Sequence, residues 1–290
     1  MIKTKTLDQN KFLIISYLLL YASLVIGFFS GEDLNSGATA DWYKTDFPVI
    51  RDLTVNIKET LLNYESYGHR HSPVYLIFLS LFVKAGLSFD VVRFLHLNFS
   101  IFLIYFFYKC LVLKFDKIDK NLLIILSISI FFSPTFRSLA IWPSTTIIGL
   151  IFFVISIYEF LKFKKNPSIN TVWKNLIYLI IASYISPNFS LFILYFFYHY
   201  LKKLNFKTII LISTFCFILA LPAFYYLFIL EINFLSPGTP GIAQDTNKLS
   251  FNFSNKILII GSIILFHLIP FIINKNFFIE FVQSFKKNIV

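Results

Sequence analysis

The sequence predicts an all-α membrane protein, and two observations carry that prediction. The 290 residues are 57% hydrophobic and 14% charged, with a mean hydropathy of +0.73. A soluble domain of this length is about half apolar and a quarter charged. The apolar residues also come in long runs with almost no charge, as membrane-spanning helices do. Together these features exclude a soluble enzyme, a disordered chain and a secreted disulfide scaffold.

The apolar runs predict one polytopic helix bundle, a single transmembrane domain over residues 1–290, with about eight to nine membrane helices. The first run, 12–29, follows three lysines and lacks a small-x-small cleavage site, so we expect an uncleaved helix. The later runs are 73–87, 91–108, 121–132, 145–160, 176–185, 189–200, 209–230 and 257–273. Several are shorter than the roughly 20 residues that a spanning helix needs, which predicts short, paired helices within the bundle.

Lysine and arginine are distributed unevenly between the connecting segments. One set holds 17 of the 26 such residues: 1–11, 109–120, 162–174, 202–207 and 275–290. A longer set holds eight: 30–72, 88–93, 133–146 and 231–256. Because cytoplasmic loops are enriched in Lys and Arg, we expect both termini to be cytoplasmic and 30–72 to lie outside. Composition suggests the cytoplasmic (inner) membrane of a bacterium.

One crossing is ambiguous in this scheme. Two apolar runs, 73–87 and 91–108, separate the outer loop from the lysines at 109–120, although a single crossing is needed. Either 73–87 is re-entrant, or those lysines lie outside.

The long outer loop at 30–72 is predicted to carry an amphipathic helix over about 46–65. Its apolar side chains recur at spacings of three and four residues: Ile50, Leu53, Ile57, Leu61 and Tyr64. Asp46 can cap the helix start and Pro48 suits the first turn. We expect this helix to lie along the outer membrane surface.

Ionisable residues gather at the outer face of the predicted bundle, where such groups are costly and tend to mark function. They are Glu32, Asp33, Asp41, Asp46, His69, Arg70, His71, Asp90, Arg93 and Arg137. The alternative is that a long polar loop simply carries solvated charges. Small residues precede Asp41, and the aromatic pair Trp42 and Tyr43 follows it. With Tyr75, these rings suit either a sugar-stacking surface or an aromatic belt at the membrane interface.

Three short motifs make the sequence resemble the GT-C class of membrane glycosyltransferases, such as the dolichyl-phosphate-mannose-protein mannosyltransferase family. An acid, Glu32-Asp33 or Asp41, lies in the first outer loop, and His71-Ser72-Pro73-Val74-Tyr75 opens the next apolar run. Residues 132–137 and 182–188 resemble two further regions of that class. The resemblance implies a GT-C-like bundle and an inverting transfer of a sugar from a polyprenyl-phosphate donor to a glycan, lipid or protein acceptor.

The resemblance also assigns roles to the loop acids. Asp41, and after it Asp33, is expected to be the general base that takes the proton of the acceptor hydroxyl. Cations can stabilise the phosphate charge as the glycosidic bond breaks, and the candidates are Arg137, His71 and Arg93. Trp42, Tyr43 and Tyr75 are expected to contact the sugar or the acceptor. No cofactor is certain; Glu32, Asp33 and Asp41 could hold a divalent metal.

Other functions remain open at this stage. A polysaccharide polymerase or ligase of the O-antigen type also acts outside the cell on lipid-linked sugar, but usually relies on arginines, and this chain has four. A flippase or transporter of lipid-linked sugar would often show inverted repeats, and none is evident. A scaffolding membrane subunit is a further alternative. Membrane lipid is an expected partner; nucleic acid is not, because the lysines flank apolar runs as membrane anchors do.

Overall fold

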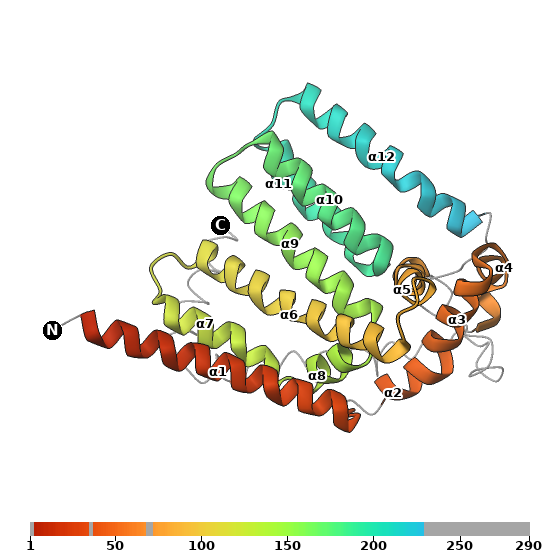
Figure 1. The fold of residues 1–290 in the computed structure, drawn as a ribbon. Coiled ribbons are helices and arrows are strands. Elements are labelled where there is room, and N and C mark those ends of the chain that lie inside the picture. Colours follow the sequence, from red (N-terminus) through yellow and green to blue (C-terminus); the bar gives the residue numbers. More distant parts are fainter. Residues whose placement is uncertain (1–2, 35–36, 68–71, 229–290) are drawn as a thin grey trace, which may run out of the picture. The chain divides into compact units, whose positions relative to one another are not determined.

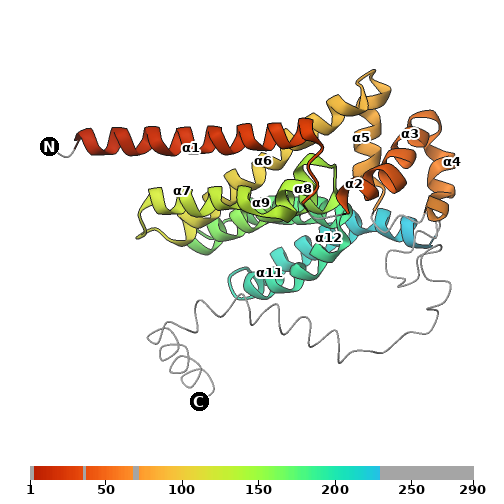
Figure 2. The ribbon, with the colours of Figure 1, turned by 90° about the horizontal axis from the view of Figure 1, so that it is seen from below.

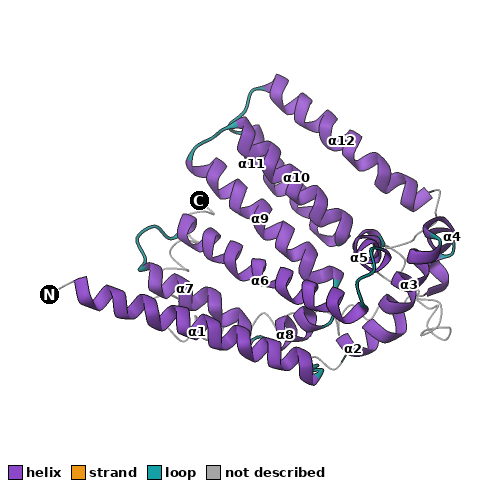
Figure 3. Ribbon diagram, viewed as in Figure 1, coloured by secondary structure: helices purple, strands orange, loops and turns teal. Residues whose placement is uncertain are grey.

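The computed structural model describes residues 3–34, 37–67 and 72–228, and every regular element within them is helical (Figure 3). All of these residues belong to one compact unit, Met1–Gly241. The all-α prediction is therefore confirmed for the described part of the chain. The expected run at 257–273 and the cytoplasmic C-terminus lie outside the described residues, as does the expectation of one domain over the whole chain.

The helices differ widely in length. The long ones are α1 (Lys3–Ser30), α6 (Phe89–Lys114), α9 (Thr145–Lys165), α10 (Ile169–Ile185) and α12 (Phe206–Phe228). The shorter α-helices are α2 (Ala38–Asp41), α3 (Phe47–Val55), α4 (Ile57–Leu62), α5 (Val74–Lys84), α7 (Lys120–Ile128), α8 (Pro134–Ile141) and α11 (Phe192–Leu201). Four tighter or wider turns accompany them: η1 (Trp42–Asp46), η2 (Tyr64–Tyr67), η3 (Ser129–Phe132) and η4 (Pro187–Leu191).

The long helices and the shorter α7 lie side by side, in the spatial order α1, α7, α6, α9, α10 and α12 (Figures 1 and 2). Helices α2 to α5 gather at the end of this row where α1 and α10 end and where α6 and α9 begin (Figure 1). The lysine-rich ends of α6 and α9 point the other way. The first loop and the lysine clusters thus lie at opposite ends of the helices, as the lysine distribution predicts.

Within residues 3–34, 37–67 and 72–228, three helices are long and apolar enough to cross a membrane: Phe89–Lys114, Thr145–Lys165 and Phe206–Tyr225. A bent pair, Lys120–Phe132 with Pro134–Ile141, could form a fourth crossing with a 67° kink. Helix α5 has 11 residues, about half of what a crossing needs. That length suits the re-entrant alternative for the run at 73–87.

Most helices begin where a polar side chain accepts a hydrogen bond from a free backbone N–H group, as good N-caps do. Serines serve α6, α8, α9 and α10, and an aspartate serves α7: Ser88, Ser133, Ser144, Ser168 and Asp119. Proline follows the cap of α8 at its first position, where its missing N–H costs nothing. The kink between η3 and α8 therefore has a local cause in the Ser-Pro pair.

The prediction of one surface helix over 46–65 is wrong in two respects. It breaks at Asn56, whose extended backbone (φ −149°, ψ 93°) separates α3 from α4 and whose side chain caps α4. Ile50 and Leu53 are fully buried, because α3 packs on α5 and is not free to lie on the membrane surface. Asp46 is 8% exposed and makes no capping hydrogen bond through its side chain. The spacing of three and four residues does mark the apolar face of α3, but that face is covered by protein.

A buried polar network joins α9, α10 and α11. The Asn175 amide donates to the Ser156 carbonyl and hydroxyl at 2.8 and 2.9 Å, and the Tyr200 hydroxyl donates to Asn175 Oδ1 at 2.7 Å. All three residues are fully buried. Because an unpaired polar group inside an apolar bundle is costly, this network specifies how the three helices align.

We predict that Tyr200→Phe destabilises the protein by about 1 kcal/mol, because it leaves Asn175 Oδ1 buried without a donor. Tyr198→Phe is the control on the same helix, since Tyr198 is 54% exposed and its hydroxyl meets only Lys202. Thermal unfolding of the purified protein in detergent measures both. Equal midpoints for the two variants would contradict a structural role for the network.

Candidate functional site

An ion pair between Glu32 and Arg137 connects the first loop to α8. Arg137 donates from Nε to Oε1 at 2.5 Å and from Nη2 to Oε2 at 2.6 Å. The same guanidinium reaches the Ser23 hydroxyl and carbonyl on α1 at 3.3 and 3.2 Å. The two charged side chains are only 12% and 17% exposed. Arg137 thus lies beside the first loop, as expected, but the fork of N–H groups formed by its Nε and Nη2 is already filled by the Glu32 carboxylate.

The backbone turn at the end of α1 directs the Glu32 side chain towards Arg137. Gly31 adopts a left-handed conformation (φ 69°), and its N–H donates to the Phe28 carbonyl while the Glu32 N–H donates to the Gly27 carbonyl. These two bonds form a Schellman turn, in which glycine avoids the strain of a positive φ. A Cβ on Gly27 would collide with the Glu32 carboxylate. Both glycines are therefore needed for the ion pair.

Trp142, which follows α8, is the centre of a second set of contacts. Its Nε1 donates to the Glu32 carbonyl at 2.9 Å. The Arg93 guanidinium lies 3.8 Å from the centre of the Trp142 ring and 4.9 Å from the Phe28 ring. Tyr43 packs against the same indole with ring centres 5.7 Å apart. Cation–π contacts of this kind stabilise a buried guanidinium.

Arg93 is 7% exposed, yet its hydrogen bonding is incomplete. Nη1 donates to Asp90 at 3.2 Å, and the Asp90 side chain is 83% exposed. Nε and Nη2 are buried and have no partner among the described residues. Of the two predicted phosphate ligands that the structure describes, Arg93 is therefore the one with free donors. His71, the third, lies outside the described residues.

Asp33 belongs to the first loop, and its Oδ2 accepts a hydrogen bond from the Thr39 N–H, 3.0 Å away. Burial alone raises the pKa of this carboxyl, but hydrogen bonding from Thr39, with smaller contributions from Ser138 and Gly37, outweighs it and holds the pKa below its ordinary value. Asp33 is therefore ionised at neutral pH. Its Oδ1 is buried without a partner among the described residues.

The other predicted contact residues are placed very differently from one another. Asp41 is exposed at the end of α2, and its backbone carbonyl accepts from the Thr45 hydroxyl at 2.5 Å. Tyr43 is 56% exposed, whereas Trp42 is 1% exposed and packs in the core. Tyr75 is 3% exposed, with its hydroxyl hydrogen-bonded to His96. Of the three predicted aromatic contacts, Tyr43 alone is open to a ligand from solvent.

His96 was not singled out from the sequence, although an ionisable residue within an apolar run, three positions after Arg93, is a signal in itself. Its Nε2 lies 2.8 Å from the Leu139 carbonyl, which can only accept, so Nε2 carries the proton. Nδ1 of the neutral ring then accepts from the Tyr75 hydroxyl at 2.5 Å. His96 thereby connects α5, α6 and α8 in a fully buried position.

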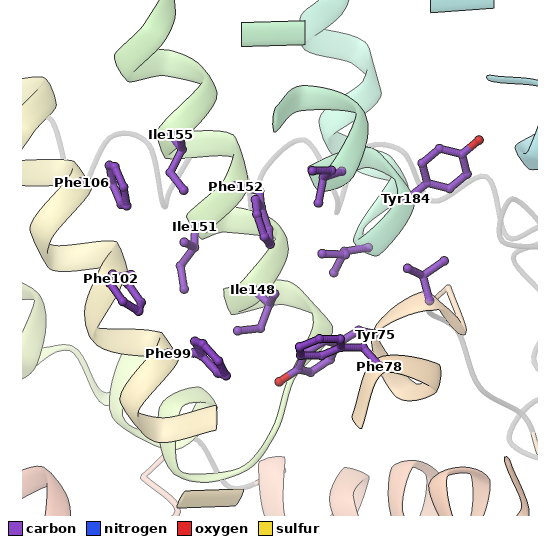
Figure 4. Close-up of a pocket in the computed structure, with 13 residues that line it drawn as sticks. Tyr75, Phe78, Phe99, Phe102, Phe106, Ile148, Ile151, Phe152, Ile155 and Tyr184 are labelled. Carbon is purple, nitrogen blue, oxygen red and sulfur yellow. The ribbon is translucent and has the colours of Figure 1, made fainter. Parts of the chain in front are cut away.

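An apolar cavity of about 690 Å³ lies between α5, α6, α9 and α10. Figure 4 shows the phenylalanines of α6 facing the isoleucines of α9 across it, with Tyr75 and Phe78 at one end. It is lined by Val74, Tyr75, Phe78, Phe99, Phe102, Phe106, Ile148, Ile151, Phe152, Ile155, Ile181, Tyr184 and Ile185. No charged side chain lines it. Sequence reasoning had no means of locating it, because the residues come from four helices.

The three acids considered for a divalent metal do not form a site together. Within the described ranges, no three His, Cys, Asp or Glu side chains converge in a way that could hold a metal ion. Glu32 is committed to Arg137 at both carboxylate oxygens.

Comparison with known proteins gives no further guide: no family model, curated protein or solved structure matches the chain.

We predict that Arg137→Gln destabilises the protein by roughly 2 kcal/mol or more, because it leaves the Glu32 carboxylate mostly buried without its cation. Arg51→Gln is the matched control. Arg51 pairs with Asp52 at 3.0 Å, but its side chain is 61% exposed, and such pairs contribute about 1 kcal/mol or less. Chemical or thermal unfolding in detergent measures the difference. If Arg137→Gln lowers the free energy of unfolding no more than Arg51→Gln does, the Glu32–Arg137 pair does not stabilise the fold.

Proposed function

We propose that this protein is a membrane glycosyltransferase of GT-C-like architecture. It transfers a sugar from a polyprenyl-phosphate donor to a glycan, lipid or protein acceptor at the outer face of the bacterial inner membrane. The observation that carries the proposal is the large apolar cavity within the helix bundle, whose wall residue Tyr75 is hydrogen-bonded to His96 and through it to α8, the helix that carries Arg137.

The cavity has the properties that an isoprenoid chain requires. Its volume of about 690 Å³ falls within the roughly 300–1,000 Å³ typical of ligand pockets. Its walls are phenylalanine and isoleucine side chains with no charge, so a hydrocarbon chain gains burial at no polar cost. A water-soluble substrate would lose its hydration there without compensation.

The cavity also lies close to groups that suit a phosphate and a sugar. Tyr75 forms part of its wall, and the Tyr75 hydroxyl bonds His96, which in turn bonds Leu139 on α8. Arg137 is on the same short helix, and Arg93 is one turn from His96 on α6. A lipid whose chain fills the cavity can therefore direct its head towards the first loop.

The reaction follows from these roles. A loop carboxylate, Asp41 or Asp33, accepts the proton of the acceptor hydroxyl. The acceptor oxygen then forms a bond to the anomeric carbon, and the bond from that carbon to the phosphate oxygen breaks. Polyprenyl phosphate leaves with the electron pair, and the guanidinium of Arg93 stabilises its charge. Attack opposite the leaving group inverts the anomeric configuration.

The proposed architecture has about eight to nine membrane helices, with both termini in the cytoplasm. The three or four candidate spans of the described residues would form its centre. Helices α5 and α11, of 11 and 10 residues, would be partial crossings within the bundle. The outer position of 30–72 places Asp33 and Asp41 on the acceptor side.

A flippase or transporter of lipid-linked sugar is the second candidate, because an apolar cavity inside a helix bundle serves lipid transport equally well. The transferase needs a general base, whereas the transporter does not. A polysaccharide polymerase or ligase would use the same donor and is distinguished by its acceptor.

We predict that Ile181→Trp raises the KM for a long polyprenyl-phosphate-sugar donor about tenfold with little change in kcat, because an indole occupies the cavity used by the chain in ground and transition state alike. Ile177→Trp, one turn earlier on α10 and 41% exposed, is the matched control. Steady-state transfer in proteoliposomes measures both. Unchanged KM in Ile181→Trp would remove the cavity from the donor site.

We predict that Asp41→Asn lowers the rate of sugar transfer by about 10²–10⁴-fold, because it removes the general base while keeping the side-chain volume. Asp41 is exposed, so folding should change by no more than about 1 kcal/mol. Asp116→Asn, an exposed acid in the loop after α6, is the control and should retain full activity.

The assay also assigns the base. Loss in Asp33→Asn with full activity in Asp41→Asn moves the base to Asp33. Full activity in both variants rejects the transferase and favours the transporter.

A further inference from the structure

Within the described residues, four buried polar side-chain atoms lack a hydrogen-bond partner: Asp33 Oδ1, Arg93 Nε and Nη2, and Thr145 Oγ1. Arg93, which supplies two of them, stacks on the Trp142 indole. The other two residues are linked to Trp142 through the chain: its N–H donates to the carbonyl preceding Asp33, and Thr145 follows it by three positions. Because buried polar groups are nearly always paired, the free Arg93 nitrogens indicate that a polar ligand binds beside Trp142.

Arg93 defines one part of that ligand. Its only ion-pair partner among the described residues is Asp90, which is 83% exposed, and two of its nitrogens have no acceptor. A guanidinium presents its N–H groups as a planar fork, which matches two oxygens of one phosphate. Arg137 cannot offer the same fork, because Glu32 fills it. A phosphate is therefore directed to Arg93.

The other two residues define the rest of the ligand. An ionised Asp33 oxygen can only accept a hydrogen bond, so it requires a donor such as a hydroxyl. The Thr145 hydroxyl can donate or accept. A sugar phosphate supplies phosphate oxygens and hydroxyl groups in one molecule.

We propose that Asp33, Arg93, Trp142 and Thr145, the Trp142 cluster, bind the glycosyl-phosphate head of a lipid-linked sugar. The Arg93 fork binds the phosphate, and Asp33 accepts a hydrogen bond from a sugar hydroxyl. This assignment rests on the proposed function, and it excludes Arg137 as a phosphate ligand.

Tyr43 is the exposed neighbour of the cluster. The free nitrogens of Arg93 have almost no contact with solvent, so a phosphate must displace a neighbouring side chain. Tyr43 packs on Trp142, interacts electrostatically with Arg93 and is 56% exposed. It is the neighbour with room to move outward.

The test compares two probes that share one chain: farnesyl phosphate and farnesol, bound to the full-length protein in nanodiscs of zwitterionic lipid. The ratio of their Kd values isolates the contribution of the phosphate. In the unaltered protein we expect the phosphate to bind about tenfold tighter or more. Arg93→Gln should bring the ratio close to one with the Kd of farnesol unchanged, Arg93→Lys should leave an intermediate ratio, and Arg51→Gln, at a side chain that is 61% exposed, should keep the ratio of the unaltered protein.

Several results would overturn the assignment. A ratio near one in the unaltered protein shows that no phosphate site is present. A ratio that stays at the value of the unaltered protein in both Arg93 variants removes the phosphate from Arg93. Displacement of farnesyl phosphate by millimolar inorganic phosphate identifies a site for free phosphate and rejects the lipid head as its source.

The same assay separates this assignment from the proposed function. Ile181→Trp should weaken both probes equally and leave their ratio unchanged, because it alters the cavity alone. If the ratio depends on Arg93 but the protein transfers no sugar, the phosphate site is supported and the transferase function is rejected.

Discussion

Glu32 and Arg137 place a carboxylate and a guanidinium in the mostly buried region between α1 and α8, where either charge alone is costly. The pair satisfies both, and it does so only because the Schellman turn at Gly31 reverses the chain. The start of the first loop is thereby held against α8. Asp33 follows directly, and Trp142 binds the Glu32 carbonyl, so the positions of the candidate base and of the indole both depend on this pair.

The same pair changes the roles of the two arginines. Both were candidates for binding phosphate, and both carry one positive charge. Arg137 is neutralised by an acid of its own protein, whereas Arg93 is buried between two aromatic rings with two donors unused. Hydrogen-bonding capacity, rather than charge, separates a structural arginine from one poised to bind a ligand. The distinction depends on contacts that a count of charges cannot supply.

The apolar and polar parts of the site meet at His96. On one side Tyr75 lines the cavity, and on the other Leu139 belongs to the helix that carries Arg137. Because both bonds of the imidazole are used, the ring is fixed in one tautomer and one orientation. The cavity wall and the ionisable cluster are thus held in register by a residue that contacts neither bulk water nor lipid.

The sequence by itself determined the helical class and the apolar runs that become α6, α9 and α12. These features are local, since an apolar run involves residues within a few positions of each other. Tertiary structure decided the rest. Glu32 and Arg137 are 105 positions apart, and Tyr75 and His96 are 21 apart. The helix predicted over 46–65 divided at Asn56 and turned its apolar face onto α5, because periodicity shows which face is apolar but not what covers it.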